Sequence, residues 1–309
     1  MSKQKVLIVG AGISGLRVAQ LLPKSLYEVI VVEKGRGVGG RMATRRFDDT
    51  KADHGAQYFS VKTSVFQDFI EKAEQHQIVK QWQVANRTHT RYICPAGMNT
   101  LPKWMAEGLD IRLNQKITQL SEGTATTDTG EQYTFDILVI TAPIPQVLEL
   151  FQSSNILPDE SESLMLRSIH YDPCWVVMAK LKDTNTQIIG GKILEEGPVA
   201  WVVDNAEKGL TTFSTLTIHA SSNYSEEHLE DASKEVATVL IDSISDIIHP
   251  DQIESQQVHR WRYSLASQRT ADSFLKLKKY PIYIGGDAFG MGNVEGAFLS
   301  GEAIARSMM

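Results

Sequence analysis

The pattern of apolar and polar residues is most regular at the start of the chain. An apolar run at 6–9 leads into a glycine-rich segment at 10–15, and apolar residues then recur at helical spacing over 16–22. A second apolar run, 29–32, ends at Glu33. Apolar runs bounded by glycine and followed by helical periodicity are typical of a strand–helix–strand unit. The first 33 residues therefore predict a βαβ unit with a glycine turn after its first strand.

The rest of the chain alternates between helical and strand-like patterns. Helical periodicity predicts an amphipathic helix over 61–80, a turn entering a helix over 97–106, one long helix over 226–249 and a last helix over 294–308. Short apolar or β-branched runs predict strands at 111–113, 116–120, 136–143, 174–181, 199–203, 211–217, 257–263 and 282–284.

These elements predict two domains of different character. The βαβ start and the strand–helix end favour a Rossmann-like α/β nucleotide-binding domain, which we expect to comprise 1–60, 96–147 and 278–309. The β-rich middle, with its covering helix, favours an interleaved α+β substrate domain built on an antiparallel sheet, comprising 61–95 and 148–277. A substrate pocket where the two domains meet is the expected arrangement.

The glycine segment has the spacing of a dinucleotide fingerprint. Gly10 would form the tight turn, Gly12 would let the backbone approach a pyrophosphate, and Gly15 would let the helix pack closely on the strand. The N–H groups at the start of the helix, including those of Ile13 and Ser14, would face the phosphates. Glu33 would accept hydrogen bonds from the adenosine ribose.

The segment after Glu33 distinguishes between dinucleotides. An NAD domain would usually continue with a helix and a strand, whereas here a glycine-dense loop follows, from Lys34 to Gly40-Arg41-Met42. Such a loop lets backbone amides approach a large flat ligand, and the arginine guanidinium can bind a pyrophosphate with two hydrogen bonds. This favours FAD.

The end of the chain predicts a second glycine-framed helix start. A short strand delivers Gly286-Asp287, and a turn leads into the last helix near Asn293, the predicted N-cap, and Val294. A positive helix end beside a flavin would stabilise the negative charge of the reduced ring.

Composition and charge narrow the class of protein. Of the 309 residues, 42% are hydrophobic and 22% are charged, as in globular domains with a large core. The net charge of −6 argues against a nucleic-acid or anionic-membrane surface. Cys94 and Cys174 lack metal or redox spacing, and the histidines form no ligand-like cluster, so we expect no metal. The cysteine usage and the lack of a signal-like or membrane-spanning run predict a cytoplasmic protein.

Several motifs together resemble the flavin amine-oxidase superfamily, and within it the chain is most similar to the renalase group. The resemblance covers both ends of the chain well and the middle in part. It rests on the segments 10–15, Glu33, 39–42, 53–58, 97–101, 259–263 and 285–296.

The resemblance implies how FAD would be held. It implies that the backbone of Ile117 contacts the adenine and that Asp287 bonds to the ribityl chain or the pyrophosphate. It also implies that the start of the last helix faces the flavin. No cysteine lies near the C-terminus to tether the ring, so FAD is expected to be non-covalent. The predicted cofactor-binding residues are Gly10, Gly12, Ile13, Ser14, Gly15, Glu33, Lys34, Gly40, Arg41, Met42, Gln57, Tyr58, Ile117, Gly286, Asp287 and Val294.

The resemblance also implies a reaction. Renalase-like enzymes oxidise misreduced dihydro-isomers of NAD(P) to NAD(P)⁺ by hydride transfer to flavin and then to oxygen, with hydrogen peroxide formed. Aromatic rings can stack on a nicotinamide, and the alternation of 259–263 would place Arg260 and Arg262 together on the opposite face, where they could bind its phosphates. The predicted substrate-pocket residues are Tyr58, Tyr171, Trp201, His259 and Trp261.

Two alternatives remain open at this point. One is a flavin amine oxidase or a dehydrogenase of another small substrate, although no residue identifies the lysine that many such enzymes place near the flavin. The other is a non-catalytic flavin-binding interaction or sensor protein.

Overall fold

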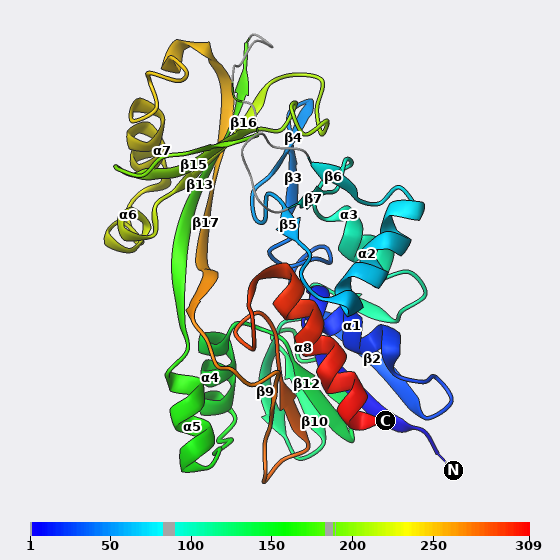
Figure 1. Cartoon of the computed structure of the whole chain (residues 1–309). Helices are drawn as coiled ribbons and strands as arrows, with labels where there is room; N and C mark the ends of the chain where they lie inside the picture. Colours follow the sequence, from blue (N-terminus) through cyan, green and yellow to red (C-terminus); the bar gives the residue numbers. More distant parts are fainter. Residues whose placement is uncertain (1, 83–89, 183–187, 189) are drawn as a thin grey trace. The chain divides into compact units, whose positions relative to one another are not determined.

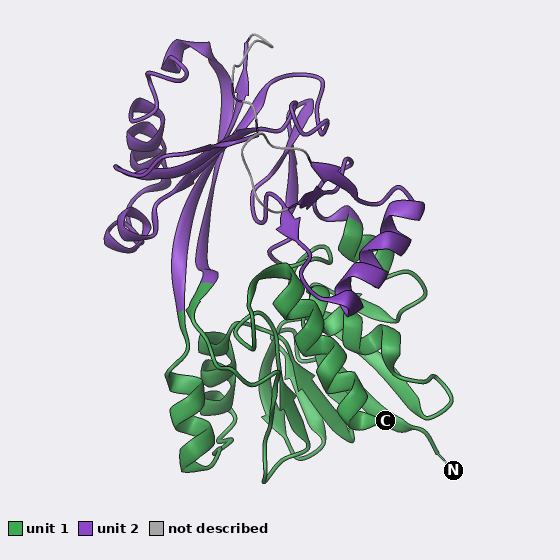
Figure 2. Cartoon of the chain, in the orientation of Figure 1, with its two compact units in different colours: residues 1–40, 101–170, 266–309 green, residues 41–100, 171–265 purple. Residues whose placement is uncertain are grey.

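A computed structural model describes residues 2–82, 90–182, 188 and 190–309 (Figure 1). The chain forms two compact units. Unit 1 comprises residues 1–40, 101–170 and 266–309, and unit 2 comprises 41–100 and 171–265 (Figure 2).

Unit 1 is built on a mainly parallel sheet with strand order β18-β19-β12-β1-β2-β8. The pairs formed by β1, β2, β8, β12 and β19 are parallel, and β18 pairs antiparallel with β19. A smaller antiparallel sheet has the order β11-β10-β9. The elements of unit 1 are β1 (Gln4–Val9), α1 (Ile13–Leu21), β2 (Tyr27–Glu33), α3 (Thr100–Met105), β8 (Ile111–Leu113), β9 (Ile117–Ser121), β10 (Thr124–Thr127), β11 (Gln132–Thr134), β12 (Ile137–Ile140), α4 (Ile144–Ser153), α5 (Glu160–Arg167), β18 (Leu275–Lys276), β19 (Ile282–Ile284) and α8 (Asn293–Met308).

The main sheet places the glycine turn at a topological switch point. Chain order reverses on the two sides of β1, because β2 lies on one side of it and β12 on the other. Ligands of open α/β sheets bind beyond the carboxyl ends of the strands at such a point. The central strands are buried on both faces, which explains why 6–9 and 29–32 are almost uninterrupted apolar runs.

Unit 2 is built on a sheet with strand order β14-β15-β16-β13-β17, accompanied by the smaller sheets β3-β4 and β5-β7-β6. The pairs β14–β15, β15–β16 and β13–β16 are antiparallel. The elements of unit 2 are β3 (Thr44–Phe47), β4 (Thr50–Asp53), β5 (Phe59–Ser60), α2 (Ser64–Gln75), β6 (Lys80–Trp82), β7 (Arg91–Ile93), β13 (His170–Leu181), β14 (Lys192–Ile193), β15 (Val199–Asp204), β16 (Thr215–Ala220), α6 (Ser222–Glu227), α7 (Ser233–Asp242), a 3₁₀ turn (Pro250–Gln252) and β17 (Ile253–Gln268).

The core of unit 2 lies between its large sheet and α7. Val177 and Ile218 on the sheet and Val236 and Leu240 on the helix are almost fully buried in one apolar cluster. The predicted mixed α/β fold with an antiparallel second sheet is therefore confirmed.

The predicted long helix over 226–249 is wrong. The chain forms α6, which ends at Glu227, and α7, which begins at Ser233. Between them, the carbonyl of His228 accepts a hydrogen bond from Trp175 Nε1 (3.0 Å), and the carbonyl of Leu229 accepts one from Arg260. Side chains thus bind carbonyls at the break, and Ala232 takes an extended conformation before α7 begins.

Smaller differences concern the ends of elements. The helix predicted over 61–80 is limited to α2, where the Thr63 side chain accepts a hydrogen bond from the N–H of Phe66. The strand predicted from residue 211 begins at Thr215. Gly292, with φ of +75°, occupies the N-cap of α8 that we predicted for Asn293, and no side chain caps this helix.

The two units are also divided differently from the predicted domains. Residues 41–60 belong to unit 2, because the β3–β4 hairpin packs on the large sheet there; for example, Thr50 Oγ1 and Thr215 Oγ1 are 2.7 Å apart. Residues 96–100 also belong to unit 2, whereas 148–170 and 266–277 belong to unit 1. The boundaries at 170/171 and 265/266 fall within β13 and β17, so the hydrophobic pattern of a continuous strand gives no sign of these two.

Candidate functional site

The glycine turn of unit 1 has the close contacts that the fingerprint predicts. Gly10 has φ of +111°, which favours glycine. A Cβ on Gly15 would lie 2.1 Å from the carbonyl oxygen of Gly10, so the turn and α1 pack too closely for any side chain there. Thr141, which follows β12, donates hydrogen bonds to the carbonyls of Val9 (3.3 Å) and Gly10 (3.2 Å) and so holds the turn from the neighbouring strand.

Glu33 is fixed beside this turn at the end of β2. Its Oε2 accepts a hydrogen bond from Ala11 N (2.9 Å), and its Oε1 accepts one from Gly35 N (2.6 Å). A carboxylate has about four acceptor positions, so these two bonds leave room for ribose hydroxyls. The neighbouring Lys34 donates to Gln146 Oε1 (2.7 Å).

The loop that follows lies against the glycine turn. Gly39 N donates to the carbonyl of Ala11 (2.8 Å), and a Cβ on Gly40 would lie 3.7 Å from Gly12 Cα. Both loop glycines have positive φ, +114° and +53°. The backbone of the predicted flavin-specific loop therefore borders the dinucleotide fingerprint.

The C-terminal glycine segment lies two strands away in the same sheet. Gly286, with φ of +130°, follows β19 and donates its N–H to Ser300 Oγ (3.0 Å). Asp287 and Val294 are buried, as is Ile117 at the start of β9. Because β19 is parallel to β12 and β12 is parallel to β1, both glycine segments lie at the carboxyl edge of one sheet.

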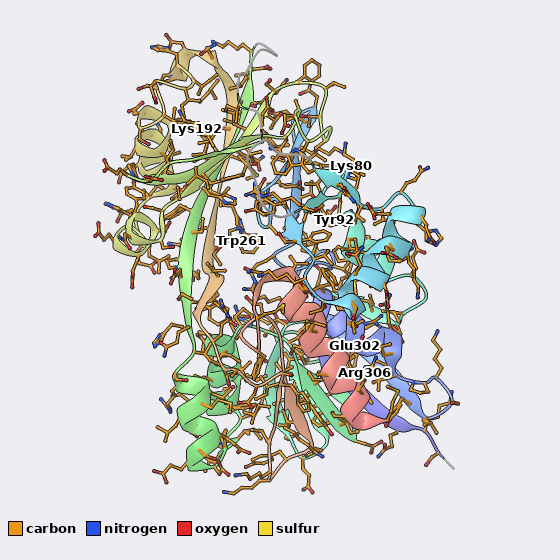
Figure 3. All side chains as sticks on the ribbon, in the orientation of Figure 1. Lys80, Tyr92, Lys192, Trp261, Glu302 and Arg306 are labelled. Atoms are coloured by element: carbon orange, nitrogen blue, oxygen red, sulfur yellow. The ribbon has the colours of Figure 1, made fainter. Side chains whose placement is uncertain are left out.

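The two helices that start at this edge pack on each other (Figure 1). A Cβ on Gly301 would lie 2.3 Å from the carbonyl oxygen of Ser14, so α8 and α1 are in backbone contact. Arg17 binds Glu302, which also binds Arg306; both α8 residues are labelled in Figure 3. Opposite ends of the chain thus build one edge.

The surroundings of Ser14 and Gly12 indicate whether this edge of the sheet can bind a dinucleotide. The side chain of Ser14 is buried, but its Oγ has no hydrogen-bond partner among the described residues. Beside it, a Cβ on Gly12 would meet no atom of the described chain within 4 Å, apart from its own neighbours. An unpaired hydroxyl and open space at a helix N-terminus are what a pyrophosphate requires, so these residues fit FAD.

The remaining predicted cofactor residues belong to unit 2. Arg41 donates to the carbonyl of Ser264 (3.2 Å), and its guanidinium lies 5.6 Å from the ring of Tyr171. Met42 is buried. A Cβ on Gly55 would lie 1.9 Å from the carbonyl oxygen of Arg41, so the segment around Gly55 packs directly on this arginine's backbone.

Gln57 takes part in an internal network that the sequence did not reveal. Its Nε2 donates to the carbonyls of Asp53 (2.6 Å) and Gly55 (3.1 Å), and its Oε1 accepts from Lys208 (3.0 Å). The Gln57 side chain is thus engaged within unit 2, and its role in cofactor binding stays a prediction. Gln57 shapes the segment, and Lys208 is a buried residue that we did not predict.

Tyr58 and Trp201 form one aromatic group in unit 2. Their rings are 6.0 Å apart, and the Arg91 guanidinium lies 3.9 Å from the Tyr58 ring centre. Trp82 lies 6.1 Å from Tyr58 on another side. The Nε1 atom of Trp201 is buried and has no hydrogen-bond partner among the described residues.

His259 and Trp261 form a second group with His54, which we call the His54 cluster. The rings of His54 and Trp261 are stacked at 5.4 Å, and His259 lies edge-on to both, at 4.8 and 4.3 Å. Trp261, labelled in Figure 3, donates its Nε1–H to the carbonyl of His54 (2.8 Å). Tyr171 lies near Tyr263, at 6.0 Å. The predicted pocket residues thus fall into separate groups of unit 2.

The histidines in and near this cluster are uncharged at neutral pH. Burial, followed by the charges of His259 and Arg45, lowers the pKa of His54 to about 3. Burial and Arg45 lower the pKa of His259 to about 4, and burial and Lys208 lower the pKa of His219 to about 4.

Arg260 and Arg262 do share a face of β17, as the alternation predicts. Both, however, bind Glu230: Arg260 NH1 lies 3.2 Å from Glu230 Oε2, and Arg262 NH2 lies 2.8 Å from the same oxygen. Their role in binding substrate phosphates stays a prediction.

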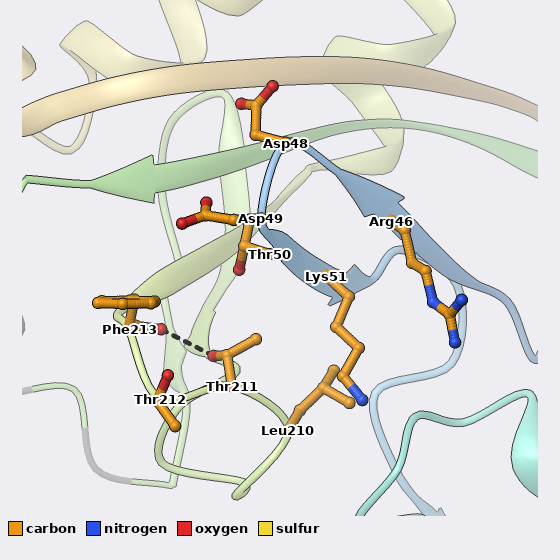
Figure 4. Close-up of a pocket in the computed structure, with 9 residues that line it drawn as sticks. All are labelled: Arg46, Asp48, Asp49, Thr50, Lys51, Leu210, Thr211, Thr212 and Phe213. Carbon is orange, nitrogen blue, oxygen red and sulfur yellow. Dashed lines mark hydrogen bonds between the residues drawn. The ribbon is translucent and has the colours of Figure 1, made fainter.

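A groove of about 420 Å³ lies elsewhere in unit 2 (Figure 4). The β3–β4 turn and the loop at 210–213 line it, and none of the predicted site residues is among its lining residues. Its carboxylates are engaged, since Asp48 accepts from Ser255 Oγ and Asp49 binds Lys180 Nζ. This groove is not the predicted substrate site.

Two absences among the described residues bear on the class of protein. No group of three or more His, Cys, Asp or Glu side chains in that part of the chain could hold a metal ion. None of the helices described is long and apolar enough to cross a membrane.

The parallel sheet, the glycine turn and the acidic residue at the end of β2 define a Rossmann-type dinucleotide-binding protein. Residues 8–73 match the model of the NAD(P)-binding Rossmann-like domain, and residues 62–309 match that of flavin containing amine oxidoreductases. The chain belongs to the flavin containing amine oxidoreductase family. It is an FAD-dependent oxidoreductase.

Individual relatives agree with this assignment. The chain is 25% identical to renalase from Mus musculus, and the match covers 98% of both proteins. It is 51% identical to an L-amino acid oxidase from Cerastes cerastes over 45 residues, 15% of this chain and 9% of that protein. The predicted renalase-like membership of the superfamily is confirmed.

Solved structures share the fold. Putrescine oxidase bound to putrescine matches with a TM-score of 0.74 at 16% identity, covering 99% of each chain. A fatty acid isomerase from P. acnes matches with a TM-score of 0.73 at 12% identity, covering 100% of each. At such identities the likeness establishes the architecture and not the reaction.

An Arg41→Ala variant is expected to bind FAD about tenfold to a hundredfold more weakly, because a charge-assisted bond to a phosphate contributes about 1.5–3 kcal/mol. Fluorescence titration of the apo-protein with FAD measures the change. Arg46→Ala removes an exposed arginine of β3 and is the matched control. A variant that keeps its yellow colour through gel filtration as well as the parent does would refute the role of Arg41.

Proposed function

We propose that this enzyme oxidises isomeric dihydronicotinamide nucleotides to NAD(P)⁺ and passes the electrons to oxygen, releasing hydrogen peroxide. The similarity to renalase over nearly the whole length of both proteins supports this reaction. So does the lack of a second nucleotide fingerprint in the sequence, which leaves a small reduced substrate as the source of electrons.

The His54 cluster is the observation that carries the proposal. A dihydronicotinamide becomes aromatic when it loses hydride, so it needs no base to remove a proton beforehand. The cluster offers aromatic faces for stacking, and His54 and His259 are held uncharged by their lowered pKa values. Both histidines are far weaker bases than a general base poised near neutral pH would be.

FAD, when bound, supplies the hydride acceptor of the reaction and the route to oxygen. The chain's own residues bind and orient. Ser14 and the α1 N-terminus are proposed to hold the pyrophosphate, Glu33 the ribose, and Trp261 one face of the nicotinamide.

Anaerobic stopped-flow measurements on the FAD-loaded enzyme test the reaction. Isomeric dihydronicotinamide nucleotides are expected to bleach the flavin within milliseconds to seconds. We expect no such bleaching with ordinary NADH, with NADPH or with a panel of amines. Admission of oxygen should then restore the yellow colour with one peroxide per substrate. Reduction by amines alone would identify an amine oxidase, and reduction by none of these donors would indicate a flavin-binding protein without this activity.

A Trp261→Ala variant is expected to reduce its flavin about tenfold more slowly at low substrate concentration, because it loses a stacking contact of about 1.4 kcal/mol. FAD affinity should change by less than about twofold, a shift of only about 0.4 kcal/mol. Trp104→Phe, on α3 of unit 1, is the control for tryptophan replacement in general. An unchanged reduction rate in Trp261→Ala would remove this residue from the substrate site.

A further inference from the structure

Lys208 is a lysine buried in unit 2 with a fixed set of partners. Its Nζ donates to Asp53 Oδ2 (2.8 Å) and to Gln57 Oε1 (3.0 Å), and the side chains of Lys208 and Asp53 are each only 2% exposed. A buried ion pair is weak evidence of stabilisation, because desolvation offsets much of its attraction. The location of this ion pair therefore says more about its role than its contribution to stability does.

Both partners of Lys208 lie in the segment 53–58, which carries part of the resemblance to the flavin amine-oxidase superfamily and contains the predicted cofactor residues Gln57 and Tyr58. Asp53 also accepts hydrogen bonds from Thr44 Oγ1 (2.6 Å) and Met98 N (2.9 Å) through Oδ1. Its carbonyl accepts from Thr217 Oγ1 (2.8 Å) on β16. One carboxylate and its backbone thus tie together several separate parts of unit 2.

Lys208 also determines which way the amide of Gln57 faces. An ammonium group only donates, so it selects the amide oxygen of Gln57 and directs the NH₂ group to the carbonyls of Asp53 and Gly55. The amide of Gln57 is thus engaged at both ends, and it ties the turn that begins at Asp53 to Lys208. Without Lys208, the Gln57 oxygen and the Asp53 carboxylate would be left buried without this partner.

We propose that Lys208 is a positioning residue for the cofactor. Its ion pair with Asp53 and its bond to Gln57 hold the segment 53–58 in the conformation that receives the flavin, so FAD affinity depends on a side chain that does not itself contact FAD. The proposal rests on the predicted role of this segment in FAD binding and does not depend on which substrate is oxidised.

Titration of the apo-protein with FAD, without substrate, tests this role. Lys208→Met is expected to raise the Kd for FAD about tenfold or more, because Asp53 and Gln57 lose a buried partner, and to alter the visible absorption bands of the bound flavin. Lys180→Met is the matched control, because Lys180 is also buried in unit 2 and paired with Asp49 (2.7 Å) and Glu254 (3.1 Å) but does not contact the segment. If Lys208→Met lowers the Tm of the apo-protein but leaves the Kd and the bands unchanged, Lys208 has only a structural role and the proposal is wrong.

A double-mutant cycle separates positioning from general damage. Asp53→Asn should weaken FAD binding as Lys208→Met does, since the lysine would then lose its counter-charge. The double variant should bind FAD more tightly than the two single effects together predict, because no unpaired buried charge remains. Strictly additive effects would overturn the proposal. If Lys208→Met fails to fold, Lys208→Gln replaces it in the cycle with Asp53→Asn. Lys208→Gln keeps a hydrogen-bond donor without the charge, so the same test of additivity applies.

Discussion

A Gly12→Ala variant is expected to fold as the parent does and to lose most of its affinity for FAD. The φ of Gly12 is −74°, which alanine adopts readily, and its added Cβ would meet no atom of the described chain within 4 Å apart from its own neighbours. The open space is the place proposed for the pyrophosphate, where a methyl group would block the approach of the backbone. We expect the Kd for FAD to rise about a hundredfold, or about 2.7 kcal/mol. The Tm of the apo-protein should fall only slightly, because alanine is a poorer N-cap than glycine.

Two other glycines provide the comparison. In Gly15→Ala the new Cβ would lie 2.1 Å from the Gly10 carbonyl, a backbone atom that cannot rotate away, so both apo-protein stability and FAD affinity should fall. Gly37 is also open on its Cβ side, and Gly37→Ala should change neither quantity. Calorimetry of the apo-proteins and FAD titrations of all three variants measure both quantities. A Gly12→Ala variant that binds FAD with the parent's affinity would exclude a pyrophosphate at this helix start.

The fingerprint could be predicted because its requirements are local. A turn with positive φ at Gly10, a close helix–strand contact at Gly15 and an acid at the end of the next strand are all determined within 33 residues. The alternation along β17 is local in the same sense, and it correctly placed Arg260 and Arg262 on one face.

The features that were missed depend on residues distant in the chain. The helix expected over 226–249 breaks where Trp175 and Arg260, on other strands, bind its carbonyls. Nothing near Lys208 in the sequence marks it as buried, because its partners are about 150 residues away. The pairing of Arg260 and Arg262 with Glu230 likewise follows from tertiary packing, because Glu230 lies about 30 residues away in the chain.

Unit 2 is expected to lose stability steeply below about pH 6.5, because its buried histidines are held neutral. The pKa values of His54, His219 and His259 are lowered to about 3, 4 and 4, whereas the unfolded chain binds protons with a pKa of about 6.5. Between these values the unfolded state binds more protons, so the free energy of unfolding falls as the pH falls. At about pH 5, His54 alone should account for a loss of about 2 kcal/mol, fully regained above about pH 6.5.

A His54→Phe variant isolates this effect. Phenylalanine keeps a flat ring against Trp261, removes the titrating group and leaves in place the backbone carbonyl that Trp261 binds. Urea unfolding of the FAD-saturated chain at about pH 7, 6 and 5 gives the slope of the unfolding free energy against pH. In His54→Phe this slope should be smaller, by an amount that corresponds to the uptake of up to about one proton on unfolding. His170→Phe, at an exposed histidine, is the control for replacing a histidine by phenylalanine. Equal slopes for the parent and His54→Phe would mean that His54 accepts its proton as readily in the folded chain as in the unfolded one, and the uncharged state assigned to His54 beside Trp261 would then have to be abandoned.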